Sequence, residues 1–378
     1  MIIALLGATG SIGRQALDVV RTTLPHAKIE ILTGHRNTKL LVELAAEFSP
    51  EYIWVPDATA AGELRHCNAK VLTGESELLS YIKSCNANVV VNAMVGGAGL
   101  RPTLAAIEAG KDIALANKES LVTAGQLIMP LAKKMGVRIT PIDSEHSAIW
   151  QCLQGNDIAA VEKIILTASG GPFRTWEKEK IAAATAEDAL RHPNWNMGPK
   201  ITIDSATFMN KGLELIEAMW LFDQPLSNIE IVVHPQSLIH SMVQYIDGSI
   251  IAQIGTPDMR MPILYALSAP DRVKTNFPRL DLLTAGSGNM TFEAPCEIRF
   301  PCLALAKHAA IVGGTLPAVM NAVNEWAVGQ FLNKKINFYD ISELIIQAFG
   351  AYHVKPLTCA ADIAEAEAWA ADYIKSKG

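Results

Sequence analysis

The sequence is short of charge, of paired cysteines and of long apolar runs, and each shortage excludes a class of protein. Only 19% of its 378 residues are charged, and the formal net charge is −6, which argues against nucleic acid as a partner. Because no uninterrupted apolar run reaches about 18 residues, we expect no membrane-spanning helix. The N-terminus lacks a basic segment followed by an apolar run, so we expect no secretory signal.

The six cysteines are scattered, and none of them forms a C-x-x-C pair. This distribution is typical of reduced structural thiols, and we expect a cytoplasmic protein. Hydrophobic residues make up 50% of the chain, which is enough for large cores. A chain of this length is expected to form two or three domains.

A glycine-rich turn near the N-terminus indicates a nucleotide. It lies between an apolar strand pattern and a helix pattern, in MIIALLGATGSIGRQALDVV, and its glycines have the spacing G-x-x-G-x-x-G. Such glycines permit a tight turn and a close approach of the backbone to a pyrophosphate, which the helix N-terminus then stabilises. Strand and helix patterns continue to alternate, so we predict a Rossmann-like nucleotide-binding domain over residues 1–143. The candidate contacts in the turn are Gly7, Thr9, Gly10, Ser11 and Ile12.

The exit of the second predicted strand indicates which nucleotide binds. The strand KIEILTG ends near Gly34, and the region that follows contains no acidic residue for the ribose hydroxyls. Arg36, beside His35, suits a 2′-phosphate instead, so we predict NADPH, with Gly34, Arg36 and Asn37 as candidate contacts. The alternative is an arginine in an ordinary solvated turn.

Carboxylates suggest a metal site. Asp143 and Glu145 follow a strand pattern, and in an extended segment their side chains would point the same way. With Glu214 they offer three hard oxygen ligands, which suit Mg²⁺ or Mn²⁺, with Co²⁺ as a further candidate. A single D-x-E pair at the end of a strand is otherwise only a solvated pair.

The segment DSATFMNKGLELIE is predicted to bind a phosphate group. We expect Asp204 or Ser205 to cap a helix that runs to about Phe222. Three polar residues then share one side of that helix, because they are three or four positions apart. They are Asn210, Lys211 and Glu214. The alternative is a polar helix face with an ordinary cap.

Two further segments carry candidate residues. The predicted strand DIALANKES delivers Asn117, Lys118 and Glu119 to the carboxyl end of a parallel sheet, where ligands bind. The loop HPNWNMG has no helical or strand period and contains Trp195 and Met197, so it is either pinned into a core or acts as a lid.

The rest of the chain divides by pattern. Residues 144–268 mix helices with strands and are predicted to form an α/β domain, with a β-hairpin at Asp247-Gly248. Residues 269–292 are rich in Pro, Gly, Asp and Ser and are predicted to be a linker. Residues 293–378 are predicted to form a small helical bundle.

Together these motifs resemble the 1-deoxy-D-xylulose 5-phosphate reductoisomerase family of the non-mevalonate isoprenoid pathway. The resemblance runs in order along the whole chain and is carried by long segments, among them GATGSIG, ALANKESLV, IDSEHSAIWQ, ASGGPFR, RHPNWNMG, KITIDSATFMNKGLELIEA and HPQSLIHSMV. It implies NADPH- and cation-dependent conversion of 1-deoxy-D-xylulose 5-phosphate to 2-C-methyl-D-erythritol 4-phosphate. The rearrangement would be a retro-aldol and aldol sequence, followed by reduction. It also implies a homodimer that acts on a small sugar phosphate, with residues 144–268 as its catalytic and dimerisation domain.

The resemblance assigns roles to residues that match its motifs. It implies that Asp143, Glu145 and Glu214 hold the metal and are catalytic together with Lys118. It implies that the phosphate is bound by Ser169, Ser205, Asn210 and Lys211. The substrate would be lined by Lys118, Ser144, Glu119 and His192, with Trp195 covering it as part of a flap and His146 behind the metal. Contacts to the cofactor would also come from Asn117, Glu119 and Gly198.

Two other functions are compatible with parts of the pattern. An NADP-binding sensor would use the glycine turn without any chemistry, but it would need neither a metal site nor a phosphate site. A semialdehyde dehydrogenase also begins with a GATG-like turn, but it needs a thiolate nucleophile with a base partner.

Overall fold

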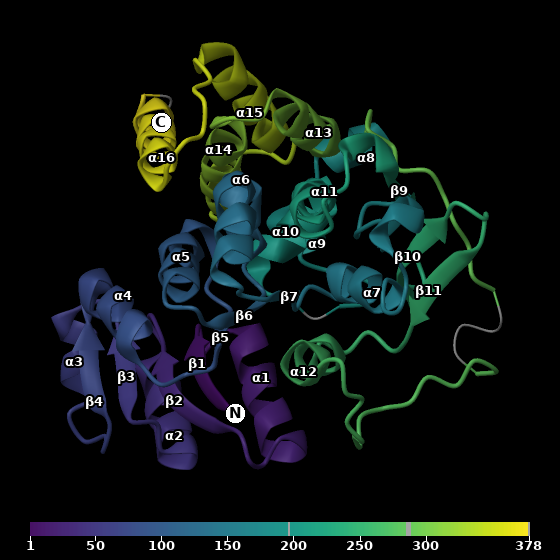
Figure 1. Ribbon diagram of the computed structural model, residues 1–378. Coiled ribbons are helices and arrows are strands. Elements are labelled where there is room, and N and C mark those ends of the chain that lie inside the picture. The colour runs from purple at the N-terminus through teal and green to yellow at the C-terminus, as the bar shows by residue number, and fades with distance from the viewer. Residues whose placement is uncertain (196, 285–288, 377–378) are drawn as a thin grey trace. The chain divides into compact units, whose positions relative to one another are not determined.

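The computed structural model describes residues 1–195, 197–284 and 289–376, which form two compact units (Figure 1). Unit 1 consists of Met1–Ser120, Ile128–Ser147 and Asp258–Phe277. Unit 2 consists of Leu121–Leu127, Ala148–Pro257 and Pro278–Gly378. The four-part division expected from the sequence remains a prediction, because compactness alone groups the helical tail with the central region.

A seven-stranded sheet forms the centre of unit 1. All its neighbouring strands are parallel, and their order is β4-β3-β2-β1-β5-β6-β7. From β1 the chain adds strands towards one edge of the sheet, and from β5 it adds them towards the other edge. Open parallel sheets bind ligands at such a point, here between β1 and β5. The strands are β1 Ile2–Leu6, β2 Lys28–Thr33, β3 Tyr52–Val55, β4 Lys70–Thr73, β5 Val89–Asn92, β6 Asp112–Leu115 and β7 Ile139–Pro141.

Helices pack against this sheet because their apolar residues recur at helical spacing. Leu17 of the first helix lies in one buried cluster with Leu5, Leu32 and Ile263, so α12 belongs to this core although it is distant in the chain. The helices are α1 Ser11–Thr23, α2 Thr38–Phe48, α3 Ala58–Glu63, α4 Gly74–Ser84, α5 Leu100–Glu108, α12 Arg260–Ser268 and the short η1 Gly96–Gly99, with α6 Lys118–Met135 shared between the units. The predicted Rossmann-like alternation is confirmed.

Unit 2 contains a four-stranded mixed sheet of order β11-β10-β8-β9. Its strands are β8 Val161–Ala168, β9 Ile229–Val233, β10 Ile239–Tyr245 and β11 Ile250–Ile254. The β10–β11 pair is antiparallel and turns at Asp247 and Gly248, where the glycine has φ +83°. The predicted hairpin is therefore confirmed, and β11 forms one edge of the sheet.

Unit 2 also contains a series of helices (Figure 1). Those before the tail are α8 Lys178–Ala182, α9 Ala186–Ala189, α10 Pro199–Thr207, α11 Met209–Leu221, and the short η2 Ile158–Ala160 and η3 Leu226–Asn228, while α7 Ser144–Cys152 is shared with unit 1. The predicted helical tail is confirmed as α13 Cys302–Val312, α14 Leu316–Leu332, α15 Asp340–Ala351 and α16 Ala360–Lys375.

The predicted linker has little regular structure. Residues 271–284 and 289–292 contain no helix or strand, while 285–288 lie outside the described residues. Within the described part of the chain, no helix is long and apolar enough to cross a membrane.

Two local predictions are wrong. The helix expected from Asp204 or Ser205 to Phe222 is two helices, because Phe208 has a left-handed backbone with φ +64°. Its ring is buried and stacks on Phe300 at 4.8 Å, and this tertiary contact stabilises a conformation that the local sequence disfavours. The helix α10 begins instead at Pro199, a favoured first residue.

The second wrong prediction concerns the D-x-E pair. The strand β7 ends at Pro141, and α7 begins at Ser144, directly after Asp143. The backbone N–H of Glu145 donates to Asp143 Oδ1 at 3.3 Å. Because carboxylates at a helix start accept such bonds, the pair lies at a helix N-terminus and not in an extended segment.

Candidate active site

The glycine turn after β1 is defined by close backbone contacts. A Cβ on Gly7, which has φ +85°, would lie 2.4 Å from the carbonyl oxygen of Ala93, and one on Gly13 would lie 2.2 Å from the oxygen of Gly7. Gly10 precedes α1 and provides no side-chain cap. The N-terminus of α1 is thus suited to a pyrophosphate, and only glycine fits at positions 7 and 13.

The exit of β2 places its three candidates differently. Gly34 is buried, and its Cβ position lies 3.0 Å from the side chain of Leu41. Asn37 caps α2, since its Oδ1 accepts from the N–H of Leu40 at 3.0 Å. Arg36 is exposed. The asparagine therefore has a structural role here, and the guanidinium is the group with charge to offer a 2′-phosphate.

The loop after β6 is organised by Asn117. Its Nδ2 donates to the carbonyl oxygens of Met94 at 3.0 Å and Gly96 at 2.8 Å, and its Oδ1 accepts from the N–H of Ser120 at 3.1 Å. The asparagine thus joins the loops that follow β5 and β6 and caps α6. Lys118 and Glu119 consequently lie in the first turn of that helix, and not at the end of the strand as predicted.

An ion pair links the ends of β6 and β7. Lys118 Nζ lies 2.5 Å from Asp143 Oδ2, with side chains 7% and 11% exposed. Burial by itself would raise the pKa of Asp143, but Lys118 and His146 together hold that pKa well below its usual range. The Ser144 hydroxyl donates to Glu145 at 2.5 Å. Asp143 is therefore ionised at neutral pH, and with Glu145 it offers the oxygen donors that Mg²⁺ or Mn²⁺ prefers.

In unit 2, the Ser-Gly-Gly loop after β8 lies directly on α10. The Cβ position of Gly171, at φ +67°, is 2.8 Å from the carbonyl oxygen of Ser205. Ser169 Oγ accepts from the N–H of Gly171 at 3.2 Å and lies 2.9 Å from His192 Nε2. The structure therefore brings three predicted substrate residues together: Ser169, His192 and Ser205.

The tautomer of His192 follows from its partners. Its Nδ1 accepts from the backbone N–H groups of Trp195 at 2.9 Å and Asn194 at 3.3 Å. The proton therefore lies on Nε2, which donates to Ser169 Oγ. Burial lowers the pKa of His192 to about 4, so the ring is neutral at pH 7 and acts as a fixed hydrogen-bond donor.

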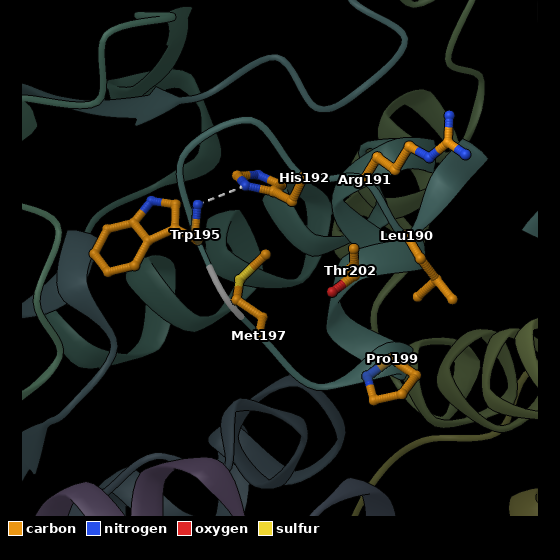
Figure 2. A pocket seen from close by; sticks show the side chains of 7 residues that line it. All are labelled: Leu190, Arg191, His192, Trp195, Met197, Pro199 and Thr202. Carbon is orange, nitrogen blue, oxygen red and sulfur yellow. Dashed lines mark hydrogen bonds between the residues drawn. The ribbon is translucent and has the colours of Figure 1, made fainter. Parts of the chain in front are cut away.

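The segment around His192 borders a pocket of about 410 Å³. Figure 2 shows His192, Met197 and Thr202 around its middle, with the indole of Trp195 at one end and Arg191 directed away at the other. The indole is half-buried, and its centroid lies 5.9 Å from the ring of His240. Asn196 lies outside the described residues, and the flap remains a prediction.

One carboxylate organises the start of α11. Asn210 Nδ2 donates to Glu214 Oε1 at 2.5 Å, and the ammonium of Lys211 pairs with Glu214 Oε2. The glutamate is 1% exposed and the lysine 5%. The prediction that these three side chains share one side of the helix is confirmed. A buried carboxylate is costly unless it is paired, and here an ammonium and an amide satisfy it.

The described thiols do not favour a cysteine nucleophile. Burial raises the pKa of Cys152 to about 11 and that of Cys302 to about 12, and it also raises that of Cys85. A hydrogen bond with Arg299 lowers the pKa of Cys296, but no histidine or carboxylate is among the groups that act on it. A semialdehyde dehydrogenase would need such a base.

Sequence reasoning missed two contacts that support the site. Arg174 forms a 2.5 Å ion pair with Glu293, and its side chain lies against the Cβ position of Gly170. Asn324 donates from α14 to Asp204 of α10 at 2.9 Å. In both cases the partners are more than a hundred residues apart, so no local pattern could have identified them.

The chain matches known proteins along nearly all of its length. Residues 3–125 match the family model of 1-deoxy-D-xylulose 5-phosphate reductoisomerase, residues 139–222 the model of its C-terminal domain, and residues 254–373 that of the DXP reductoisomerase C-terminal domain. The 1-deoxy-D-xylulose 5-phosphate reductoisomerase of Acetivibrio thermocellus is 52% identical over 372 residues, covering 97% of each chain.

Solved structures agree with the sequence matches. A crystal structure of DOX-P reductoisomerase in complex with NADPH, fosmidomycin and magnesium superposes with a TM-score of 0.94 at 40% identity, covering 100% of this chain and 98% of that one. The enzyme from Zymomonas mobilis in complex with NADPH gives 0.88 at 44% identity, covering 99% of both chains. The chain therefore belongs to the 1-deoxy-D-xylulose 5-phosphate reductoisomerase family.

Proposed function

We propose that the protein converts 1-deoxy-D-xylulose 5-phosphate to 2-C-methyl-D-erythritol 4-phosphate in non-mevalonate isoprenoid synthesis, with NADPH and a divalent cation. The observation that carries the proposal is the full-length match to a reductoisomerase solved with NADPH, fosmidomycin and magnesium. Neither rival function accounts for that match together with the buried Lys211–Glu214 pair on α11.

The turn after β1 is the proposed NADPH site. Gly7, Gly10 and Gly13 leave room for the pyrophosphate at the N-terminus of α1, and Thr9, Ser11 and Ile12 belong to the same turn. Arg36 is proposed to bind the 2′-phosphate, because it is exposed beside the exit of β2 and the neighbouring Asn37 is used as a cap. NADPH supplies the hydride for the reduction.

Asp143, Glu145 and Glu214 are the proposed metal ligands. Asp143 fits this role because its low pKa keeps it ionised, and Glu214 fits because a buried carboxylate needs a cation. A cation held there supplies Lewis-acid polarisation of the substrate carbonyl. Lys118 remains beside Asp143 as the proposed catalytic lysine, and Ser144 orients Glu145 through its hydroxyl.

Lys211 and Glu214 are proposed to exchange partners when the ligands bind. In the structure each balances the charge of the other. Glu214 would hold the metal, and the ammonium of Lys211 would bind the phosphate of the sugar, with Asn210, Ser205 and Ser169 as directional donors. Metal binding to Glu214 would free Lys211 for the phosphate, and phosphate binding to Lys211 would free Glu214 for the metal. Metal and sugar phosphate should therefore bind cooperatively.

The segment from His192 to Gly198 is proposed to act as a flap. His192 is a neutral donor next to Ser169, and Trp195 is a large apolar group on a segment whose described residues, 192–195 and 197–198, form no helix or strand. Closure over the sugar would exclude water during the rearrangement, which protects reactive intermediates.

We further propose that the protein is a cytoplasmic homodimer that uses β11. This edge strand carries three exposed isoleucines, Ile250, Ile251 and Ile254, and Ile246 in the hairpin turn is also exposed. An exposed apolar edge strand favours pairing with a second chain. Free thiols at all six cysteines are compatible with a reducing compartment. Sedimentation of the purified protein would test the dimer, and a monomer at all concentrations would contradict it.

The experiment that tests the function is NADPH oxidation followed at 340 nm with 1-deoxy-D-xylulose 5-phosphate. We expect oxidation that depends on the sugar phosphate and on Mg²⁺ and stops when the metal is chelated. NADPH binding without oxidation would favour the sensor. Turnover that is abolished by thiol alkylation would favour a semialdehyde dehydrogenase.

A further inference from the structure

A buried asparagine connects the helical tail to the segment that carries Ser205. Asn324 in α14 is 0% exposed, and its Nδ2 donates to Asp204 Oδ1 in α10 at 2.9 Å. Asp204 is 1% exposed, and its second oxygen, Oδ2, lies 2.8 Å from Lys200 Nζ. The carboxylate is therefore held from two sides, once within its own helix and once by the tail.

The helix α10 is the piece that Asn324 fixes in place. It begins at Pro199, directly after the predicted flap, and ends at Thr207, after which Phe208 turns the chain into α11 and Lys211. The carbonyl of Ser205 lies against Gly171 of the Ser-Gly-Gly loop. A shift of α10 would thus move the flap, this loop and the phosphate-binding lysine together.

Asp204 is too far inside α10 to cap it, so a helical cap does not explain why a carboxylate is buried there. Buried charges are stabilised only by partners with good geometry. Lys200 pairs with Oδ2 of Asp204 and by itself would leave Oδ1 unsatisfied. Asn324 donates to Oδ1. The contact with Asn324 therefore ties α10 to α14 of the tail.

We propose that Asn324 is a positioning residue for the sugar-phosphate subsite, acting through Asp204 on Ser205 and the start of α11. This inference rests on the proposed function. It gives the helical tail a part in substrate binding, although none of its residues is proposed to touch the substrate.

The test compares Asn324→Ala with Asn321→Ala. Asn321 is a matched control, because it is 2% exposed in the same helix but donates within that helix, to Glu325 Oε1 at 2.8 Å. We expect Asn324→Ala to raise KM for the sugar phosphate about tenfold, the effect of one lost charged hydrogen bond. KM for NADPH should stay within about twofold, and Asn321→Ala should change neither constant.

Two further variants separate positioning from folding. Asn324→Ser keeps a small polar group and replaces the alanine variant if that one does not fold. Asn324→Asp would face Asp204 with a second carboxylate and should weaken sugar-phosphate binding more than alanine does. The exchanged pair Asp204→Asn with Asn324→Asp restores an amide–carboxylate contact, and should recover much of the affinity that Asn324→Asp loses.

The outcomes are distinct. An active Asn324→Ala or Asn324→Ser enzyme with an unchanged KM for the sugar phosphate would overturn the inference, whatever its melting temperature. Equal increases of both KM values, matched by Asn321→Ala, would also overturn it. A wild-type protein that does not oxidise NADPH with the sugar phosphate would overturn the proposed function first.

Discussion

The turn that opens α1 and the junction that joins α10 to α11 both lead into helices proposed to bind phosphate groups, yet they are held in different ways. The α1 turn is held by backbone contacts that only glycines permit, such as Gly13 against Gly7. The junction is held by side chains from elsewhere in unit 2, with Phe208 stacked on Phe300 and Asp204 bonded to Asn324.

This difference predicts different sensitivities. A turn built from its own backbone should bind its ligand independently of ions, because little charge is involved in shaping it. A site built from buried charges should respond to every change of charge and to the metal, since a buried ion without its partner is costly. The variants below test that contrast, beginning with the largest expected effect.

Glu214→Gln should cause the largest loss. It keeps the shape of the side chain but removes the charge proposed to hold the metal and to balance Lys211. We expect turnover to fall more than about a hundredfold, with weaker Mg²⁺ binding by calorimetry. The Kd for NADPH should stay unchanged. Mg²⁺ binding equal to that of the wild type would remove Glu214 from the metal site.

Lys211→Ala should have the next largest effect. Loss of one charged hydrogen bond to the phosphate costs about 1.5–3 kcal/mol of substrate binding. It also leaves Glu214 without its ammonium partner, so the melting temperature should fall in the absence of metal and recover when Mg²⁺ is added. Titration of both ligands provides the measurement, and an equal loss for NADPH would indicate a folding defect instead.

Trp195→Ala should have a moderate effect, because the indole is only half-buried. We expect turnover to fall about tenfold, the order of a single misplaced positioning group, with little change in melting temperature. In the wild type, tryptophan fluorescence should shift when a phosphonate analogue and Mg²⁺ are added. A large stability loss without a ligand response would show that Trp195 is a core residue and not part of a lid.

Arg36→Ala should have the smallest effect. The guanidinium is exposed, and exposed charge pairs contribute only about 0.2–1 kcal/mol. The preference for NADPH over NADH should therefore fall about fivefold at most by this route, measured as the ratio of kcat/KM for the two cofactors. A wild-type enzyme that uses both cofactors equally would contradict the prediction from the missing acidic residue after β2.

The contrast also explains what the sequence could predict. The α1 turn, the alternating strands and the β10–β11 hairpin follow local rules, and their elements were predicted correctly. The break at Phe208 could not be predicted, because φ +64° is disfavoured for phenylalanine and the ring that stacks on it, Phe300, is distant in the chain. The prediction that Asn210, Lys211 and Glu214 share one side of a helix still holds, because all three residues lie within α11.

The direct test of the account is the effect of Mg²⁺ on the two binding sites of the wild-type protein, measured by calorimetry. The account predicts that 1-deoxy-D-xylulose 5-phosphate, titrated without NADPH, binds at least about tenfold more tightly with Mg²⁺, while the Kd for NADPH stays within about twofold. A tenfold change corresponds to a coupling free energy of about 1.4 kcal/mol. Sugar-phosphate binding that is indifferent to Mg²⁺, or NADPH binding that depends on it equally, would contradict the account.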